Sequence, residues 1–262
     1  MTALRVALGE YDLGWQDPPR SLERAAQVVA RAAAAGARLV VLPEMCLTGF
    51  TMDPAVHAEP VDGPHVAALA RLAADAGVEL LASIARAASE HGARSHRNSV
   101  LHVDRAGDVH VAYDKQKLFA YGGEDAVYTP GARAPRVLDV AGVRVAPFVC
   151  YDLRFPELFR AVADEADLMV VVANWPAARR AHWDTLLRAR AIENQCWVVG
   201  VNRTGRGGTL DYDGGSAAYD PWGDRADVEV DGARVVDVSV ARVAEIRERF
   251  PFLRDKGLPA VR

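Results

Sequence analysis

Four short segments of this chain are almost continuously apolar, and they restrict its fold more than any other feature. They cover residues 38–43, 143–149, 168–173 and 197–202, and each contains at least two valines. A strand with apolar side chains on both faces needs cover on both sides. The segments therefore predict buried strands inside a layered α/β protein.

The segments between these strands carry helix signals. Ser21 lies near the start of an alanine-rich stretch and is expected to cap a helix that ends at Gly36, where a left-handed backbone is expected. Further helices are predicted over residues 64–76, from Pro156 onward, and over about residues 180–194.

Other segments predict further strands, several of which follow one another directly. They lie near residues 4–9, 79–84, 99–103, 109–113, 137–140, 225–230 and 233–240. Turns at 104–108 and 141–142 join neighbouring strands into hairpins, which are antiparallel. The glycine-rich residues 203–215 are expected to form a flexible loop. Buried strands combined with hairpins favour a mixed sheet or two stacked sheets with outer helices, which is an α/β sandwich.

Length and charge limit the possible classes of function. The chain has 262 residues, half of them hydrophobic, and no repeat or linker, so we expect a single domain over residues 1–262. Its formal net charge is −4, without a basic patch, which argues against nucleic-acid or membrane partners. No apolar stretch has the length of a signal sequence or membrane span, so a cytoplasmic location is expected.

The cysteine and histidine patterns predict neither disulfides nor a metal site. Cys46, Cys150 and Cys196 are widely spaced and odd in number, and the chain has no His-Glu-x-x-His sequence. We therefore expect three free thiols. Cys196 has the pattern of a core residue, whereas Cys46 is close enough to Glu44 in sequence to line a pocket with it.

Three residues with reactive side chains lie where predicted strands end. Glu44 and Cys150 directly follow buried strands, and Lys115 comes two residues after another. A carboxylate can accept the proton of a thiol, while a lysine and a helix start lower the pKa of that thiol. Lys115 and the backbone N–H of Tyr151 could then hold the oxyanion of a tetrahedral intermediate. The pattern fits amide hydrolysis through a thioester.

Spacing alone leaves other interpretations open. A buried cysteine is usually a packing residue, and a lysine in a loop is usually solvated. A papain-like site would combine Cys150 with His182 and either Asn194 or Asn202, which have the right order in the chain. The fold could also serve only as a binding or assembly module, because a fold does not guarantee chemistry.

Three stretches resemble the signature motifs of the nitrilase superfamily of carbon-nitrogen hydrolases. They are Leu42-Pro-Glu-Met45, Tyr113-Asp-Lys-Gln-Lys-Leu-Phe119 and Val149-Cys-Tyr-Asp-Leu-Arg-Phe-Pro-Glu157, and they occur in the order found in that family. Residues 124–131, 189–194 and 215–223 resemble further family segments. The resemblance thus spans nearly the whole chain.

The resemblance implies both a site and a fold. Glu44, Lys115 and Cys150 match the catalytic residues of the family, and Glu124 matches its second glutamate, which positions the lysine and assists proton transfer. The implied fold is a four-layer αββα sandwich with two stacked mixed sheets. The implied enzyme acts on small-molecule amides, uses no metal or organic cofactor, and forms a homodimer or a larger homo-oligomer.

One departure from the family pattern concerns the lysine motif. Lys117 stands where relatives usually have a histidine, so either lysine could in principle be the catalytic one. Alignment on Tyr113 and on residues 118–119 favours Lys115.

Within the superfamily the chain looks most like bacterial ω-amidases, which hydrolyse the terminal amide of 2-oxoglutaramate or 2-oxosuccinamate. An amidase of deaminated glutathione is the alternative. Asn174 and Trp175 are expected to be pocket walls. Arg154 could anchor a substrate carboxylate, or it could brace its loop by pairing with Asp152 or Glu157. The substrate stays open, because specificity depends on loops at residues 45–63, 119–131 and 174–182.

Overall fold

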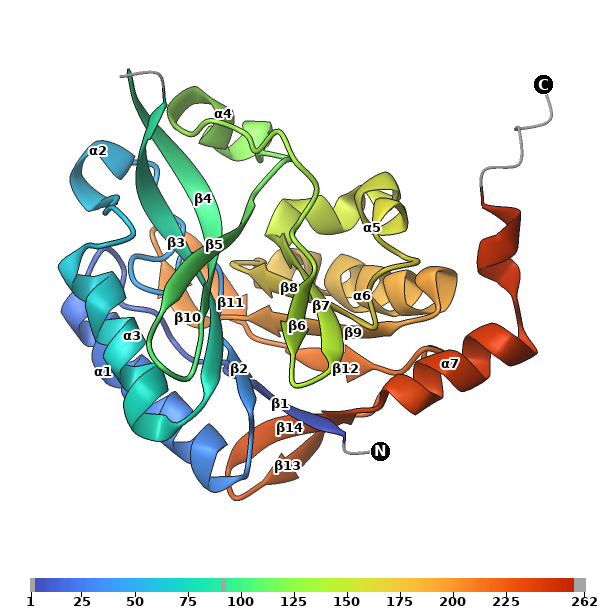
Figure 1. Cartoon of the computed structure of the whole chain (residues 1–262). Coiled ribbons are helices and arrows are strands. Elements are labelled where there is room, and N and C mark those ends of the chain that lie inside the picture. The colour runs from blue at the N-terminus through green and yellow to red at the C-terminus, as the bar shows by residue number, and fades with distance from the viewer. Residues whose placement is uncertain (1–2, 91–92, 257–262) are drawn as a thin grey trace, which may run out of the picture.

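The computed structural model describes residues 3–90 and 93–256, which form two stacked β-sheets with helices on their outer sides (Figure 1). One sheet has seven strands in the order β13-β14-β1-β2-β3-β4-β5, and the other has five in the order β12-β9-β8-β7-β6. Both are mixed, since β1, β2 and β3 pair in parallel, as do β7, β8 and β9, while the outer strands pair antiparallel. The predicted αββα sandwich is confirmed.

The elements follow the chain through one sheet and then the other before returning to the first. The seven-stranded sheet contains β1 (Leu4–Leu8), β2 (Leu39–Val41), β3 (Glu79–Glu90), β4 (Ala93–Val103), β5 (Val109–Asp114), β13 (Val228–Val230) and β14 (Ala233–Val238). The five-stranded sheet contains β6 (Leu138–Val140), β7 (Val143–Val149), β8 (Leu168–Ala173), β9 (Trp197–Asn202) and β12 (Ala217–Tyr219).

The main helices cover the two outer faces. Helices α1 (Pro18–Ala34) and α3 (Pro64–Ala76) lie against the seven-stranded sheet, and α5 (Pro156–Ala161) and α6 (Arg180–Asn194) lie against the other (Figure 1). Short helices α2 (Pro54–His57) and α4 (Glu124–Val127) lie in loops, and α7 (Val240–Arg249) leads toward the C-terminus. No helix in the described part of the chain is long and apolar enough to cross a membrane.

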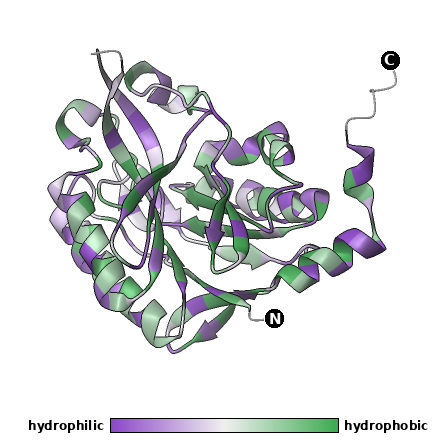
Figure 2. Cartoon of the chain, in the orientation of Figure 1, coloured by the Kyte–Doolittle hydropathy of each residue, from purple (hydrophilic) through white to green (hydrophobic). Residues whose placement is uncertain are grey.

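Strand β8 shows why the apolar segments need two layers of cover. Its side chains alternate between the two faces of the five-stranded sheet. Leu168, Val170 and Val172 pack into the core between the sheets. Met169 and Val171 pack into a second core under α5 and α6. Figure 2 shows the matching pattern on α1, α3 and α6, where hydrophilic and hydrophobic residues alternate along helices that bury one face.

The predicted boundary of the first helix was partly wrong. The helix begins at Pro18, and the side chain of Asp17 accepts a hydrogen bond from the backbone N–H of Arg20. Proline fits the first helical turn because no intrahelical partner is needed there for its missing N–H. Ser21 is buried inside the helix, where its hydroxyl bonds to the backbone of Gly14. The left-handed conformation of Gly36 is confirmed by its φ of +77°.

The glycine-rich segment was also predicted wrongly. Residues 203–215 form a hairpin of β10 (Thr204–Gly207) and β11 (Leu210–Asp213) rather than a loop without regular structure. Trp15 packs against the glycines at positions 207 and 208, whose lack of side chains leaves room for the indole. The sequence analysis also missed β12 and α7, and it made β3 and β4 too short.

Helix α6 lies so close to β9 that only glycine fits at position 200. A Cβ atom there would lie 2.7 Å from Cδ2 of Leu187 and 2.8 Å from Cζ2 of Trp183. We expect Gly200→Ala to lower the free energy of unfolding by about 1–3 kcal/mol, because the added methyl overpacks this contact. Urea unfolding measures the change.

A double variant separates overpacking from a general weakness of this strand. Leu187→Ala alone should cost about 2–5 kcal/mol through the cavity that it leaves. Combined with Gly200→Ala, the loss should be smaller than the sum of the two single losses, because the new methyl enters that cavity. Additive losses would contradict the proposed contact.

Candidate active site

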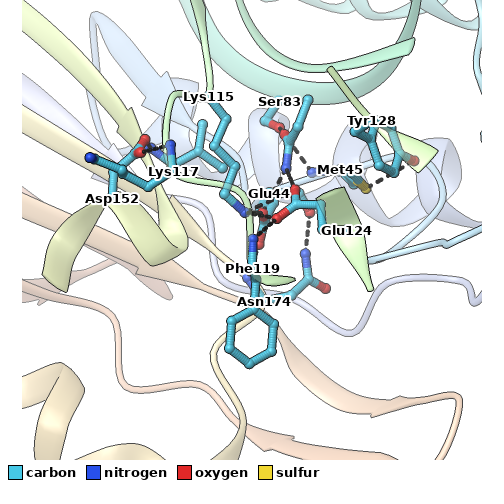
Figure 3. Close-up of polar contacts among 12 residues, drawn as sticks. Glu44, Met45, Ser83, Lys115, Lys117, Phe119, Glu124, Tyr128, Asp152 and Asn174 are labelled. Carbon is cyan, nitrogen blue, oxygen red and sulfur yellow. Dashed lines mark hydrogen bonds and ion pairs between the residues drawn. The ribbon is translucent and has the colours of Figure 1, made fainter. Parts of the chain in front are cut away.

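Three charged side chains meet at the ends of strands of the seven-stranded sheet. Glu44 follows β2, Lys115 follows β5, and Glu124 begins α4. The Nζ atom of Lys115 donates to Oε1 of Glu44 at 2.9 Å and to Oε2 of Glu124 at 2.8 Å, as Figure 3 shows. All three side chains have an exposed fraction of 0%. The structure thus brings together three of the predicted site residues.

The charges of this cluster outweigh the cost of burying the lysine. Burial alone lowers the pKa of the Lys115 ammonium, but the carboxylates of Glu124 and Glu44 oppose it, and the pKa lies well above its usual range. Lys115 is therefore charged near neutral pH. Lys117, by contrast, is partly exposed, with its Nζ atom 3.8 Å from Oε1 of Glu157. The alignment that favoured Lys115 agrees with this geometry.

Cys150 lies directly after β7, at the start of a short 3₁₀ turn over Cys150–Arg154. Its φ of +42° is in the left-handed region, which costs a non-glycine residue about 1–2 kcal/mol. Burial and the neighbouring Glu44 carboxylate raise the pKa of the thiol well above its usual value, and Lys115 opposes them. The thiol is therefore protonated near neutral pH, and it needs a base in order to react.

The thiol opens into a cavity of about 410 Å³, measured together with its open mouth. The seven-stranded sheet side contributes Glu44, Phe50, Lys115 and Phe119, and the five-stranded sheet side contributes the 3₁₀ turn and the loop after β8. The β10–β11 hairpin adds Leu210 and Tyr212. Besides Cys150, the turn contributes Tyr151 and Arg154, and the segment after β8 contributes Asn174, Trp175, Pro176 and Arg179. The predicted pocket walls at positions 174 and 175 do lie at the cavity.

Asn98, in the middle of β4, is a site residue that the sequence analysis missed. Its Nδ2 atom donates to Oε1 of Glu44 at 2.8 Å and to Oε1 of Glu124 at 3.0 Å. Its Oδ1 atom accepts from the hydroxyl of Ser83 at 2.8 Å. One amide group thus holds both carboxylates. The available signal in the sequence was a polar residue at the start of an apolar run, which is weak.

Asn174 holds Glu44 from the other sheet. Its backbone N–H donates to Oε2 of Glu44 at 2.8 Å, and its side-chain amide donates to the backbone carbonyl of the same residue. Glu44 therefore has fixed donors on both carboxylate oxygens. This contact fastens the loop after β8 to the loop after β2.

Arg154 makes neither of the ion pairs considered as a brace for its loop. Its Nη2 atom lies 3.2 Å from Nδ1 of His182, and its guanidinium carbon lies 4.8 Å from the ring centre of Trp175. Asp152 instead accepts hydrogen bonds from the end of β7 and from β5, and Glu157 lies near Lys117. Arg154 therefore lines the cavity without an acidic partner among the described residues.

Two expectations about the surroundings of Cys150 need correction. Helix α5 begins only at Pro156, so the N–H of Tyr151 belongs to the 3₁₀ turn rather than to a helix start. Cys46 does not line the cavity; it packs in the core under α1 and α3, where burial raises the pKa of its thiol to about 12. Cys196 lies in the core under α6, as predicted.

The papain-like arrangement is not formed. His182 contacts Arg154, Asn194 bonds to a carbonyl of its own helix, and Asn202 holds the backbone of Trp175. None of these contacts is to Cys150. Within residues 3–90 and 93–256, no group of three or more His, Cys, Asp or Glu side chains could hold a metal ion.

Asp152 connects the cysteine turn to the lysine loop. Its carboxylate accepts hydrogen bonds from the backbone N–H of Val149 at 3.0 Å, from the backbone N–H of Lys117 at 2.9 Å and from the hydroxyl of Tyr113 at 3.0 Å. Figure 3 shows the contact with Lys117. Burial raises the pKa of Asp152 to about 6, although Lys115 and the backbone donors lower it.

Comparison with known proteins shows the family to which the chain belongs. Residues 5–248 match the family model described as carbon-nitrogen hydrolase. Omega-amidase YafV of Escherichia coli K12 is 36% identical over 259 residues, which cover 97% of both chains. The 2-oxoglutaramate amidase of Bacillus subtilis is 28% identical and covers 94% of this chain and 95% of its own.

Solved structures agree in fold. A carbon-nitrogen hydrolase superfamily protein from Xanthomonas campestris, with an arsenic adduct in its active site, has a TM-score of 0.89 at 36% identity, covering 100% of both chains. An amidase of the nitrilase superfamily from Nesterenkonia AN1, solved as a cysteine-to-alanine mutant, has a TM-score of 0.83 at 30% identity. That match covers 98% of this chain and 95% of the other.

The bridging position of Asn98 makes its amide a testable part of the site. We expect Asn98→Leu to lower kcat/KM for amide hydrolysis by about 10- to 100-fold, because Glu44 and Glu124 lose a shared donor and repel each other more strongly. The acidic limb of the pH profile should move to higher pH. Ser83→Ala is the control, since it leaves both donated bonds in place and should change kcat/KM by less than about threefold. Wild-type kinetics in Asn98→Leu would contradict the role.

The raised pKa of Asp152 predicts a dependence of stability on pH. A carboxyl with a folded pKa of about 6 and an unfolded value of 3.8 favours the folded state when protonated. This contribution is complete below about pH 3.8 and is lost as the pH rises through about 6. Relative to Asp152→Asn, the wild type should lose on the order of 3 kcal/mol of unfolding free energy across this window. Urea unfolding of both proteins at several pH values measures it, and a constant difference would exclude it.

Proposed function

This chain belongs to the carbon-nitrogen hydrolase family, and from that premise we propose that it is a cysteine-dependent ω-amidase. It would remove the terminal amide of a small carboxylate-bearing substrate such as 2-oxoglutaramate or 2-oxosuccinamate. As a member of the family, it acts on non-peptide amide bonds. The observation that carries the proposal is the buried cluster of Glu44, Lys115 and Glu124 beside the Cys150 thiol, in a small cavity with cationic side chains.

The first half of the proposed reaction forms a thioester. Glu44 accepts the thiol proton as Sγ of Cys150 attacks the amide carbon. The negative charge that develops on the amide oxygen is stabilised by the Lys115 ammonium and the backbone N–H of Tyr151. Glu44 then gives its proton to the amide nitrogen, the carbon–nitrogen bond breaks, and ammonia leaves.

The second half reverses these proton transfers with water in place of the thiol. Glu44 removes a proton from a water molecule, which attacks the thioester carbon. The tetrahedral intermediate collapses, the carbon–sulfur bond breaks, and the thiolate takes the proton back from Glu44. Glu124 keeps Lys115 in place throughout, because it accepts two hydrogen bonds from the ammonium. The cycle needs no cofactor.

The distribution of charge along the cavity supports a substrate with a neutral amide at one end and a carboxylate at the other. Glu44 and Lys115 line the closed end, with Glu124 behind the lysine. Arg154 and Arg179 are partly exposed and lack an acidic partner in the described part of the chain. A carboxylate is repelled from the closed end and attracted to the arginines. The amide then enters toward Cys150.

Other parts of the interpretation stay predictions. A homodimer or larger homo-oligomer and a cytoplasmic location follow from the family resemblance and composition. Deaminated glutathione is the alternative substrate, and its larger size makes it a useful comparison in the same assay. A binding module without activity is disfavoured by the presence of the nucleophile, the base, the lysine and the second glutamate in one place.

Ammonia release from 2-oxoglutaramate, 2-oxosuccinamate, deaminated glutathione and simple aliphatic amides tests the proposal. We expect the two keto-acid amides to have the highest kcat/KM. Cys150→Ala should lower kcat by at least about 10⁴-fold without a change in Tm beyond a few degrees, because the nucleophile is lost and the core is not.

Two controls make the result specific to this thiol. Cys46→Ala and Cys196→Ala remove the two thiols that lie in the cores, and both variants should keep kcat near the wild-type value if they fold. Turnover by Cys150→Ala would refute the mechanism. Faster hydrolysis of deaminated glutathione than of either keto-acid amide would instead move the substrate to the alternative.

A further inference from the structure

Two arginines line the outer part of the cavity, and only one of them was expected from the sequence. Arg154 comes from the 3₁₀ turn after Cys150, and Arg179 comes from the short turn before α6. Both side chains are partly exposed, and both guanidinium groups lie against aromatic rings. The guanidinium of Arg154 lies against the ring of Trp175. The guanidinium carbon of Arg179 lies 5.4 Å from the ring centre of Phe119.

The lack of acidic partners sets these two residues apart from their neighbours. Arg180, the next residue in the chain, pairs with Asp184 at 3.0 Å and with Asp213 at 3.3 Å. No such pair is found for Arg179 or Arg154 among residues 3–90 and 93–256. A guanidinium held on an aromatic face with free donors suits a planar acceptor from a ligand.

The backbone of Arg179 is held by a hydrogen bond, although its guanidinium has no acidic partner among the described residues. Its carbonyl oxygen accepts a hydrogen bond from Nε1 of Trp175 at 2.8 Å. Trp175 in turn donates its backbone N–H to Oδ1 of Asn202 at 2.7 Å. The residue therefore presents its side chain from a rigid support rather than from a mobile loop.

The acidic residues near the cavity are already engaged. Glu44 is the acidic side chain among the lining residues, and its two oxygens accept from Lys115, Asn98 and the backbone of Asn174. Glu124 lies behind Lys115 with both oxygens occupied. A substrate ammonium would find no free carboxylate among the described residues that line this cavity.

We propose that Arg179 is a specificity-determining residue that, together with Arg154, selects substrates with a carbonyl next to their carboxylate and rejects those with an ammonium there. This inference rests on the proposed ω-amidase function. When the carboxylate lies between the guanidinium groups, the atom on the α-carbon lies beside them too. A keto oxygen accepts a hydrogen bond from a guanidinium, whereas an ammonium meets two like charges.

Three amides with the same carbon chain separate these effects. In 2-oxoglutaramate the α-carbon carries a keto oxygen, in glutaramate it carries only hydrogen, and in glutamine it carries an ammonium. We expect the wild type to show the highest kcat/KM for the keto compound, an intermediate value for glutaramate and the lowest for glutamine.

Variants at position 179 test the residue itself. Arg179→Met keeps the apolar stem and removes the charge, so it should raise KM for 2-oxoglutaramate about tenfold with little change in kcat. It should also raise the kcat/KM of glutamine relative to 2-oxoglutaramate by about tenfold or more. Arg179→Lys keeps the charge and should still reject glutamine. Arg20→Met, on the exposed face of α1, is the matched control and should change none of these values.

A binding measurement keeps this test separate from the proposed function. Calorimetry on Cys150→Ala should give tighter binding for 2-oxoglutarate than for glutarate, and the weakest for glutamate. Arg179→Met in the same background should reduce the difference in affinity between 2-oxoglutarate and glutamate. If no amide is hydrolysed but this order is found, the ω-amidase function fails and the selectivity of the arginines stands. An unchanged ratio of glutamine to 2-oxoglutaramate in Arg179→Met, or equal binding of the three acids, overturns the inference.

Discussion

The buried ion cluster of Lys115 with Glu44 and Glu124 is the interaction on which the surrounding structure depends. Removing three charges from water is costly unless each is paired and fully hydrogen-bonded. Here both carboxylates have fixed donors, which include the amide of Asn98 and the backbone N–H of Phe119 for Glu124. These donors come from different strands and loops, so the cluster forms only once the sandwich is assembled. Loss of Lys115, for example, would leave two buried carboxylates that repel each other.

The same cluster explains why the site holds a protonated thiol. Two carboxylates and one ammonium leave a net charge of −1 beside Cys150, which opposes formation of a thiolate. A thiolate would also be more open to oxidation than a thiol. With the thiol protonated, the proposed reaction has Glu44 accept a proton as the carbon–sulfur bond forms. In that proposal the developing oxyanion takes over, beside Lys115, the negative charge that Glu44 gives up on protonation.

The sequence predicted those parts of the site that depend on strand ends, and it missed those that depend on the packing of distant elements. Glu44, Lys115 and Cys150 were singled out because each follows a predicted strand, and the resemblance to the family motifs then favoured them over the other interpretations. Asn98 lies within a strand, and its role depends on which residues face it across the sheet. The β10–β11 hairpin was missed because its glycines resemble a loop, whereas they make room for Trp15. Hydrophobic periodicity and secondary-structure propensity describe one segment at a time, whereas these features depend on the segments that pack against it.

The polarity of the cavity also gives the proposed reaction a direction. The substrate reaches Cys150 with a neutral amide, which the negative cluster tolerates. Hydrolysis converts that amide into a carboxylate next to Glu44, and once Glu44 is ionised again, the product has like charge against it. The other carboxylate is still held by the arginines, whose partly exposed side chains are shared with solvent. Repulsion at the closed end therefore weakens the binding of the product relative to the amide and favours its release.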